Sequence, residues 1–115
     1  MPEPERLTLS GDTYIAYDFD LFPVTADFHP IAAVYVVTRR TGRGGPAEHE
    51  VLYVGETAKL QEHFINHPQA ECFARHKADC VGVHRQDDGG ARRETVSDLV
   101  AELKPRCNDQ SPAGG

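Results

Sequence analysis

The sequence predicts an α/β domain of the α+β kind, in which a small central antiparallel sheet is flanked by helices. Two observations carry this prediction. Residues 31–37 and 51–55 are apolar, β-branched runs of strand length, and the segment between them is glycine-rich and polar. Residues 91–104 place apolar side chains at the i, i+3, i+4, i+7 spacing of an amphipathic helix, namely Val96, Leu99, Val100 and Leu103.

The N-terminal part is expected to hold a hairpin. Residues 1–6 are polar and are expected to form a flexible tail. Residues 7–9 and 13–19 alternate apolar and polar side chains around Ser10-Gly11-Asp12, a pattern typical of two strands joined by a tight turn. Residues 20–30 contain Pro23 and Pro30 and predict an irregular connection, so that residues 7–30 form a hairpin and its connection to the central strand.

The two central strands are joined by a loop at residues 39–49. Adjacent strands connected in this way pair most simply in the antiparallel direction. This pairing would bring Tyr35 and Tyr53 close together.

Two helices and a strand are expected before the C-terminal helix. Thr57 is a suitable N-cap for a helix at residues 58–66, and Pro68 ends that helix or opens the next one. Residues 69–77 suit a second helix, whose inward side chains would be Ala70, Phe73 and Ala74.

Residues 79–85 predict a third strand of the central sheet, with Val81 and Val83 on one face. Two aspartates at positions 87 and 88 suit the positive end of the helix that follows, and Pro105 ends that helix. Residues 109–115 are expected to form a disordered tail.

Composition limits the class of protein. At 39% hydrophobic and 26% charged residues, the chain reads as a soluble globular domain. Its apolar runs are far shorter than the roughly 18 residues of a membrane span, so we expect no membrane partner. Three cysteines and a polar start predict reduced thiols and a cytoplasmic location. The sequence indicates no oligomeric state.

The charge of −6 disfavours non-specific binding to nucleic acid. Six acidic residues and one arginine lie in residues 1–30, so this segment carries −5 of the total. Arg39, Arg40 and Arg43 lie together in one loop and are candidate phosphate contacts. Their ordinary interpretation is a solvated loop.

Three features occur in an order that resembles the GIY-YIG nuclease superfamily, over residues 31–108. The first feature is the pair of tripeptides Ala33-Val34-Tyr35 and Tyr53-Val54-Gly55. The second is the run Gly55-Glu56-Thr57 leading into a helix. The third is the ending Asp98-Leu99-Val100 followed by Lys104-Pro105-Arg106-Cys107-Asn108, which is similar to the end of the family's last helix. The resemblance implies a GIY-YIG-like fold with an added N-terminal hairpin.

The resemblance also implies a site. Members of the family cleave phosphodiesters with a divalent metal. Tyr35 and Tyr53 would take the water-activating and phosphate-contacting positions, and Gly55 would let the backbone turn close by. The family's arginine position is occupied here by His63, and its metal-binding glutamate position by Val96. Valine cannot bind a hard cation such as Mg²⁺, and histidine lacks the bidentate fork of arginine.

The leading hypothesis is therefore a GIY-YIG-like domain that has lost catalysis and acts as a binding or interaction module for nucleic acid or another protein, with no cofactor. The alternative is a divergent nuclease that uses Mg²⁺ or Mn²⁺, with His63 and a carboxylate such as Glu56 or Glu71. In ordinary structural terms, Tyr35 and Tyr53 are packed strand aromatics, Gly55 is a turn residue, His63 is a solvated helix residue and Asn108 fixes the chain end.

A second alternative is a structural module that binds zinc. Cys72, His76, Cys80 and His84 are spaced C-x3-H-x3-C-x3-H and supply two thiolate and two imidazole ligands. Buried free cysteines are the commoner interpretation, and the spacing differs from the usual short-loop zinc sites.

Overall fold

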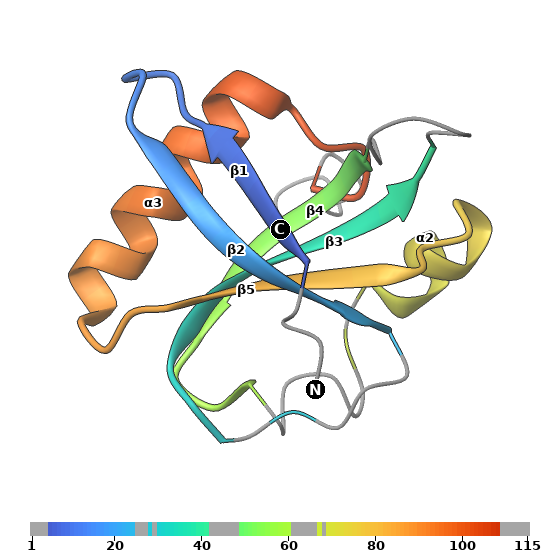
Figure 1. Cartoon of the computed structure of the whole chain (residues 1–115), viewed down its shortest axis with the longest axis horizontal. Coiled ribbons are helices and arrows are strands. Elements are labelled where there is room, and N and C mark those ends of the chain that lie inside the picture. The colour runs from blue at the N-terminus through green and yellow to red at the C-terminus, as the bar shows by residue number, and fades with distance from the viewer. Residues whose placement is uncertain are drawn as a thin grey trace, which may run out of the picture.

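Strands β3 (Ala33–Arg40) and β4 (His49–Thr57) lie side by side in the computed structural model, which describes residues 5–24, 28, 30–41, 49–60, 67 and 69–108. They belong to an antiparallel sheet in the order β1-β2-β5-β3-β4 (Figure 1). The other elements are β1 (Arg6–Ser10), β2 (Ala16–Pro23), α2 (Ala70–Arg75), β5 (Cys80–Arg85) and α3 (Gly89–Leu103). The sheet curls, and β1 and β2 pass over β3 and β4 in the view of Figure 1. The α+β class and the antiparallel sheet are confirmed.

The predicted pairing of the two central strands is also confirmed. Tyr35 pairs with Gly55 and Val37 pairs with Tyr53, with a bulge after Val37. Both strands extend further into the polar segment than predicted, to Arg40 and from His49. The β5 pairing of β3 ends at residue 38, and Arg39 and Arg40 pair only with Glu50 and His49 of β4. The polar ends of β3 and β4 are thus held extended by their pairing with each other.

Strand β2 corrects the prediction of an irregular segment directly after residue 19. It continues to Pro23, because its residues 20–23 pair with β5 at residues 80–83. Pro23 is the last residue of the strand and lies beyond the end of β1, where a missing N–H group costs little. Arg6, which was assigned to the N-terminal tail, begins β1 and pairs with Asp20.

The core lies on both faces of the sheet. On one face, Leu99 of α3 packs against the sheet side chains of Phe19, Val34, Val36 and Val54. The predicted apolar stripe of this helix is confirmed, because Val96, Val100 and Leu103 pack against the same cluster. The opposite face buries Ala33, Tyr35, Val37, Leu60, Val81 and Val83.

Helix α3 begins at Gly89, two residues earlier than predicted. The Asp88 carboxylate is its N-cap and accepts a hydrogen bond of 2.7 Å from the backbone N–H of Ala91. The helix ends before Lys104, which has a left-handed backbone at φ 47°, and Pro105 follows.

The second predicted helix is shorter than expected and shows a different inner face. Cys72 is its buried residue and Phe73 packs against the core as predicted, whereas Ala70 and Ala74 are exposed. The reason is a disulfide bond between Cys72 and Cys107, which turns Cys72 toward the C-terminal segment. The prediction of reduced thiols is therefore wrong for these two cysteines, and Cys80 is a free thiol.

Residues 61–66 of the helix predicted at 58–66 lie outside the described residues, as do residues 1–4 and 109–115 of the two predicted tails. Leu60 is buried, and its N–H donates to the carbonyl of Ile31 at 2.9 Å. Thr57 ends β4, and its hydroxyl accepts from the N–H of Lys59 at 3.1 Å. In the described part of the chain, no helix is long and apolar enough to cross a membrane.

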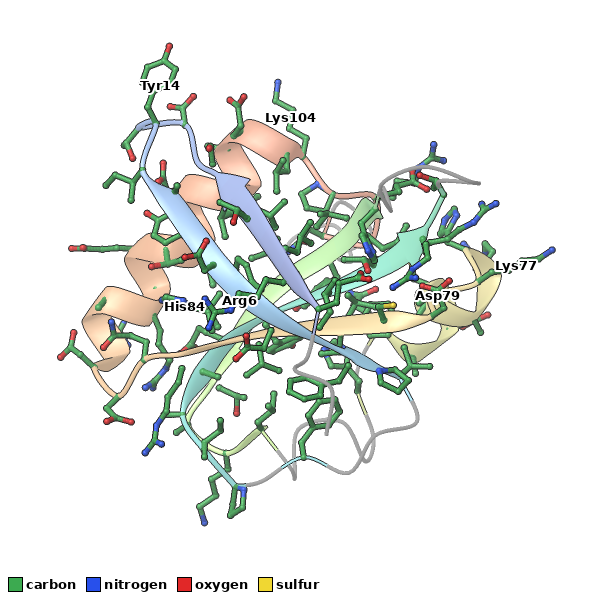
Figure 2. All side chains as sticks on the ribbon, viewed as in Figure 1. Arg6, Tyr14, Lys77, Asp79, His84 and Lys104 are labelled. Carbon is green, nitrogen blue, oxygen red and sulfur yellow. A yellow bond between two sulfur atoms is a disulfide. The ribbon has the colours of Figure 1, made fainter. Side chains whose placement is uncertain are left out.

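The connection between β1 and β2 is fixed to α3 through Asp98. The Asp98 carboxylate accepts hydrogen bonds from the N–H and hydroxyl of Thr13, at 2.9 and 2.7 Å, and from the Tyr17 hydroxyl at 2.8 Å. Gly11 packs so closely against Asp98 that a Cβ atom would overlap its carboxylate. Tyr14, at the tip, projects away from the molecule and is 91% exposed (Figure 2).

Candidate functional site

Tyr35 and Gly55, two of the residues implied by the family resemblance, are in direct contact. Tyr35 is fully buried, and its ring stacks on that of Tyr53 with 5.9 Å between centroids. A Cβ atom at Gly55 would lie 2.5 Å from the Tyr35 hydroxyl and 2.8 Å from the Tyr53 ring. Gly55 lies within β4 and not in a turn, so the turn interpretation is wrong. The glycine is required by the two tyrosines that cover it.

His67 is a hydrogen-bonding partner of the buried Tyr35 hydroxyl. Its Nε2 lies 2.7 Å from the Tyr35 Oη, and its Nδ1 accepts from the N–H of Gln69 at 2.9 Å. Because a nitrogen that accepts carries no proton, neutral His67 must carry its proton on Nε2 and donate it to Tyr35. The imidazole also contacts the rings of Tyr53 and Phe73 edge-on and tilted, at 5.1 and 4.8 Å.

This environment keeps the Tyr35 phenol protonated. Burial raises its pKa well above 10, and the neighbouring Tyr53 and Glu56 raise it further. A phenol that does not ionise cannot serve as a base for an attacking water. Tyr35 is therefore held as a structural hydrogen-bonding group.

A cleft of about 440 Å³ lies between the edge strand β4 and helix α3. Residues 53–56 form one wall, and Arg93, Val96, Ser97 and Val100 form the other, with Asn108 beside them. Tyr53, Gly55 and Val96, three positions implied by the resemblance, thus line one cleft. Tyr35 does not line it and lies beneath Gly55.

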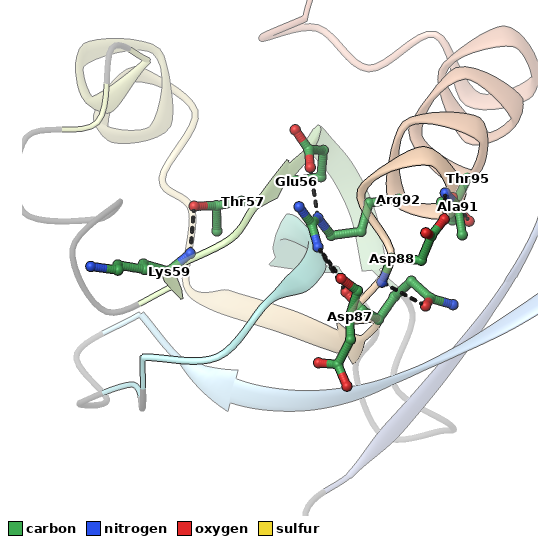
Figure 3. A network of polar contacts seen from close by, with 9 residues as sticks. Glu56, Thr57, Lys59, Asp87, Asp88, Ala91, Arg92 and Thr95 are labelled. Atoms are coloured by element: carbon green, nitrogen blue, oxygen red, sulfur yellow. Dashed lines mark hydrogen bonds and ion pairs between the residues drawn. The ribbon is translucent and has the colours of Figure 1, made fainter.

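The carboxylate in this cleft, Glu56, is held by an arginine. Arg92 is buried, and its Nε donates to Glu56 Oε1 at 2.7 Å, while its Nη1 donates to the carbonyls of Gln86 and Asp87 at 3.1 Å each (Figure 3). These contacts make a charge-assisted, partly buried pair that joins β4 to the start of α3. One oxygen of the Glu56 carboxylate, Oε1, is therefore engaged within the fold.

Glu71, the other carboxylate considered for the alternative nuclease, lies elsewhere. Its side chain is 90% exposed on α2, where it faces Arg75 at 3.8 Å. It does not line the cleft. His63, in the family's arginine position, lies outside the described residues.

Asn108 joins the chain end to β4. Its side-chain oxygen accepts from the N–H of Val54 at 2.8 Å, and its amide donates to the carbonyl of Val54 at 3.0 Å. The N–H of Cys107 donates to the carbonyl of Leu52 at 2.8 Å. The segment around Cys107 and Asn108 thus occupies the outer edge of β4 next to the cleft.

The candidate phosphate contacts lie away from the cleft. Arg39 and Arg40 are the last residues of β3, four and five positions beyond Tyr35, or about 13 to 17 Å along the strand. Arg40 pairs with Glu5 at 2.7 Å. Arg43 lies outside the described residues.

The four residues proposed for zinc do not form a site. Cys72 is bonded to Cys107, and the Nδ1 of His84 lies 3.0 Å from the carbonyl oxygen of Asp18. Within the described ranges, no three His, Cys, Asp or Glu side chains are grouped closely enough to hold a metal. The disulfide removes one thiolate from the predicted ligand set, so that arrangement is wrong for this structure.

Two residues central to this region were not selected from the sequence. Arg92 was missed because its charge suggests an exposed position on α3, and its partner lies 36 residues away. His67 comes directly after the helix predicted at residues 58–66 and has no recognisable motif around it. The available signal was its place directly before Pro68, where a helix must be interrupted.

No family model, no curated protein and no solved structure matches this chain.

Proposed function

We propose that this chain is a GIY-YIG-like domain without nuclease activity, which binds another protein in the cleft between β4 and α3. The observation that carries the proposal is the lining of that cleft. Val96 occupies the position implied for a metal-binding glutamate, and the carboxylate that does line the cleft, Glu56, is paired with Arg92 at 2.7 Å. Mg²⁺ and Mn²⁺ prefer several oxygen ligands, carboxylates above all, and Glu56 is the single carboxylate among the described lining residues.

The charge and polarity of the cleft favour a protein partner over nucleic acid. Val54, Val96 and Val100 supply apolar surface, while Arg93 contributes a single positive charge among the described lining residues. Nucleic-acid binding depends on several lysines or arginines along the phosphate backbone. An extended segment with an apolar anchor side chain fits this lining better.

The loss of catalysis is tested with the purified chain, single- and double-stranded DNA, RNA, and millimolar Mg²⁺ or Mn²⁺. We expect no cleavage above the level of a denatured sample. Cleavage that disappears in the Tyr35→Phe variant would overturn the proposal, because it would assign the activity to this chain and this residue.

The proposed alignment can be tested by restoring the missing groups. Mg²⁺ or Mn²⁺ should raise the melting temperature of the double variant His63→Arg, Val96→Glu and leave that of the original chain unchanged. His63→Arg, Val96→Gln is the matched control, since glutamine has the same shape without the charge. A response equal in both variants would count against the alignment.

Binding at the cleft is tested by selecting peptides from a random library against the whole chain. Counter-selection uses Val96→Lys, which places a charge among the apolar lining residues. We expect enriched peptides that carry an apolar anchor and bind the Val96→Lys variant at least tenfold more weakly. If the enriched peptides bind the original chain and the Val96→Lys variant equally well, they bind outside the cleft, and the proposal is contradicted.

One observation favours the alternative of a divergent nuclease. Tyr53 and Glu56 both line the cleft, so a phenol and a carboxylate would face a substrate strand that entered it. An active nuclease would show a rise in melting temperature with divalent cations in the unmodified chain, together with cleavage.

A further inference from the structure

A second group of polar side chains lies at the end of β3 and the start of β4, away from the cleft. Here the carboxylate of Glu5 contacts two donors with one oxygen. Its Oε2 lies 2.7 Å from Arg40 Nη2 and 3.3 Å from His49 Nε2. Two donors that converge on one oxygen atom form the geometry of an oxyanion-binding site.

His49 is built into this arrangement. Its side chain is only 1% exposed, and its Nδ1 lies 2.9 Å from the hydroxyl of Thr38, which is itself fully buried. A carboxylate accepts and does not donate, so the Nε2 of His49 carries the proton that points at Glu5. Thr38 fixes the ring, because its hydroxyl can serve the other nitrogen in either protonation state.

Glu5 covers this donor from a fixed backbone position. Its carbonyl oxygen accepts from the N–H of Leu21 at 2.7 Å, which holds the residue beside β2. Its side chain is 43% exposed, so it lies over His49 as a lid and is not enclosed. Removal of the Glu5 carboxylate would therefore expose the Nε2–H of His49 and, at the same time, leave the Arg40 guanidinium without this ion pair.

Space for an anion is present next to the pair. A cavity of about 180 Å³ is lined by Glu5, Arg40, Asp79 and Cys80, together with residues 21–23. Asp79 is the opposing charge there, but its oxygens already accept from the backbone N–H of Arg40 at 3.0 and 3.3 Å. An anion that enters this cavity would meet Arg40, and it would reach His49, which does not line the cavity, only by taking the place of the Glu5 carboxylate. Asp79 would weaken its affinity.

We propose that Arg40 and His49 form a binding site for an oxyanion, a phosphate or a carboxylate, and that Glu5 occupies this site as an internal competitor. An attached carboxylate acts at a high effective concentration, so free anions bind weakly while it is in place. This inference is independent of the cleft and of its proposed partner.

The test titrates inorganic phosphate, and separately acetate, into the whole chain at constant ionic strength, with binding followed by the NMR signals of the His49 imidazole and the Arg40 backbone. Glu5→Ala should bind one of the two anions at least tenfold more tightly than the original chain. Tighter binding of phosphate indicates a phosphate ligand, and tighter binding of acetate indicates a carboxylate. Glu5→Gln provides a second variant that keeps the shape of the side chain and should show the same direction.

Two controls separate a built site from general attraction to an arginine. Asp20→Ala frees Arg6 from an exposed pair at 3.4 Å that includes no histidine, and it should gain no anion binding. Adding His49→Gln to Glu5→Ala should abolish the gain. Equal phosphate and acetate binding in Glu5→Ala and the original chain, or an equal gain in Asp20→Ala, would overturn the proposal.

Discussion

At the level of single residues, the backbone of Gly55 is packed tightly against the Tyr35 hydroxyl and the Tyr53 ring. A methyl group there would need space that the buried Tyr35 ring and the half-buried Tyr53 ring occupy. Because the rings are themselves held by His67 and Phe73, they cannot move aside without breaking further contacts.

Gly55→Ala is therefore expected to lower the free energy of unfolding by about 1–3 kcal/mol, the usual cost of overpacking a core. Gly90→Ala is the matched control, since it lies in the first turn of α3, where its Cβ would meet only the ends of polar side chains. The control should change stability by less than about 1 kcal/mol. Urea denaturation measures both, and an equal effect would contradict the steric explanation.

The hydrogen bond between Tyr35 and His67 predicts a coupling between these residues. Tyr35→Phe leaves the buried Nε2–H of His67 without its phenol acceptor and should cost about 1–3 kcal/mol. In a double-mutant cycle with His67→Phe, the two losses should be non-additive by about 1 kcal/mol. Additive losses would mean that the contact at 2.7 Å contributes no stability.

The same residues show what sequence can predict about the candidate site. Tyr35 and Tyr53 could be placed together because two adjacent strands with a short connection leave few ways to pair. His67 and Arg92 could not be placed, because a hydrogen bond or an ion pair between distant residues leaves no periodic pattern. The sequence predicts a turn at Gly55, because glycine most often marks a backbone conformation that other residues avoid. In the structure the glycine is needed for another reason, since a side chain at this position would collide with Tyr35 and Tyr53.

At the level of elements, the disulfide bond between Cys72 and Cys107 joins the short helix α2 to the segment that covers β4. The bond closes a loop with a sequence separation of 35 residues. A loop of that length is expected to stabilise the fold by about 4 kcal/mol, chiefly by restricting the unfolded chain.

Replacing both cysteines, in Cys72→Ser with Cys107→Ser, should therefore lower the melting temperature strongly, and a thiol reductant should do the same to the original chain. Cys80→Ser is the control, because Cys80 is free and should leave the response to reductant unchanged. Scanning calorimetry with and without reductant measures this. A melting temperature that does not respond to reductant would contradict the bond.

The attachment of the β1–β2 connection to α3 predicts a dependence on pH. Hydrogen bonds from Thr13 lower the pKa of Asp98 below 3.8, its ordinary value. A carboxyl group whose pKa is depressed in the folded state stabilises the fold above its unfolded pKa, and this stability is lost as the pH falls through the folded value. The original chain should thus lose more stability than Asp98→Asn on acidification below about pH 4.

Denaturation at pH 6 and pH 3 measures this difference. Asp87→Asn, which removes an exposed carboxylate paired at 3.8 Å with Arg85, should keep the pH profile of the original chain. If Asp98→Asn loses as much stability between pH 6 and pH 3 as the original chain, the contacts of Thr13 and Tyr17 with Asp98 do not stabilise the attachment of the β1–β2 connection to α3.

At the level of the whole molecule, the sequence predicts the class of fold but not the full sheet. The central strands and α3 follow from local apolar patterns. The pairing of β2 with β5 joins segments about 60 residues apart, and residues 20–23 contain a proline that argued against a strand. The disulfide was not predicted, because an odd number of cysteines without a secretory signal indicates reduced thiols.

The position of Cys107 and Asn108 on β4 has a consequence for biosynthesis. A ribosome releases the chain from its N-terminus, so every strand of the sheet is synthesised before the residues that cover the edge of β4. Until those residues emerge, the nascent domain presents bare backbone donors and acceptors to any neighbouring chain. Translation that stalls between the end of α3 and Asn108 would therefore leave a product prone to aggregate.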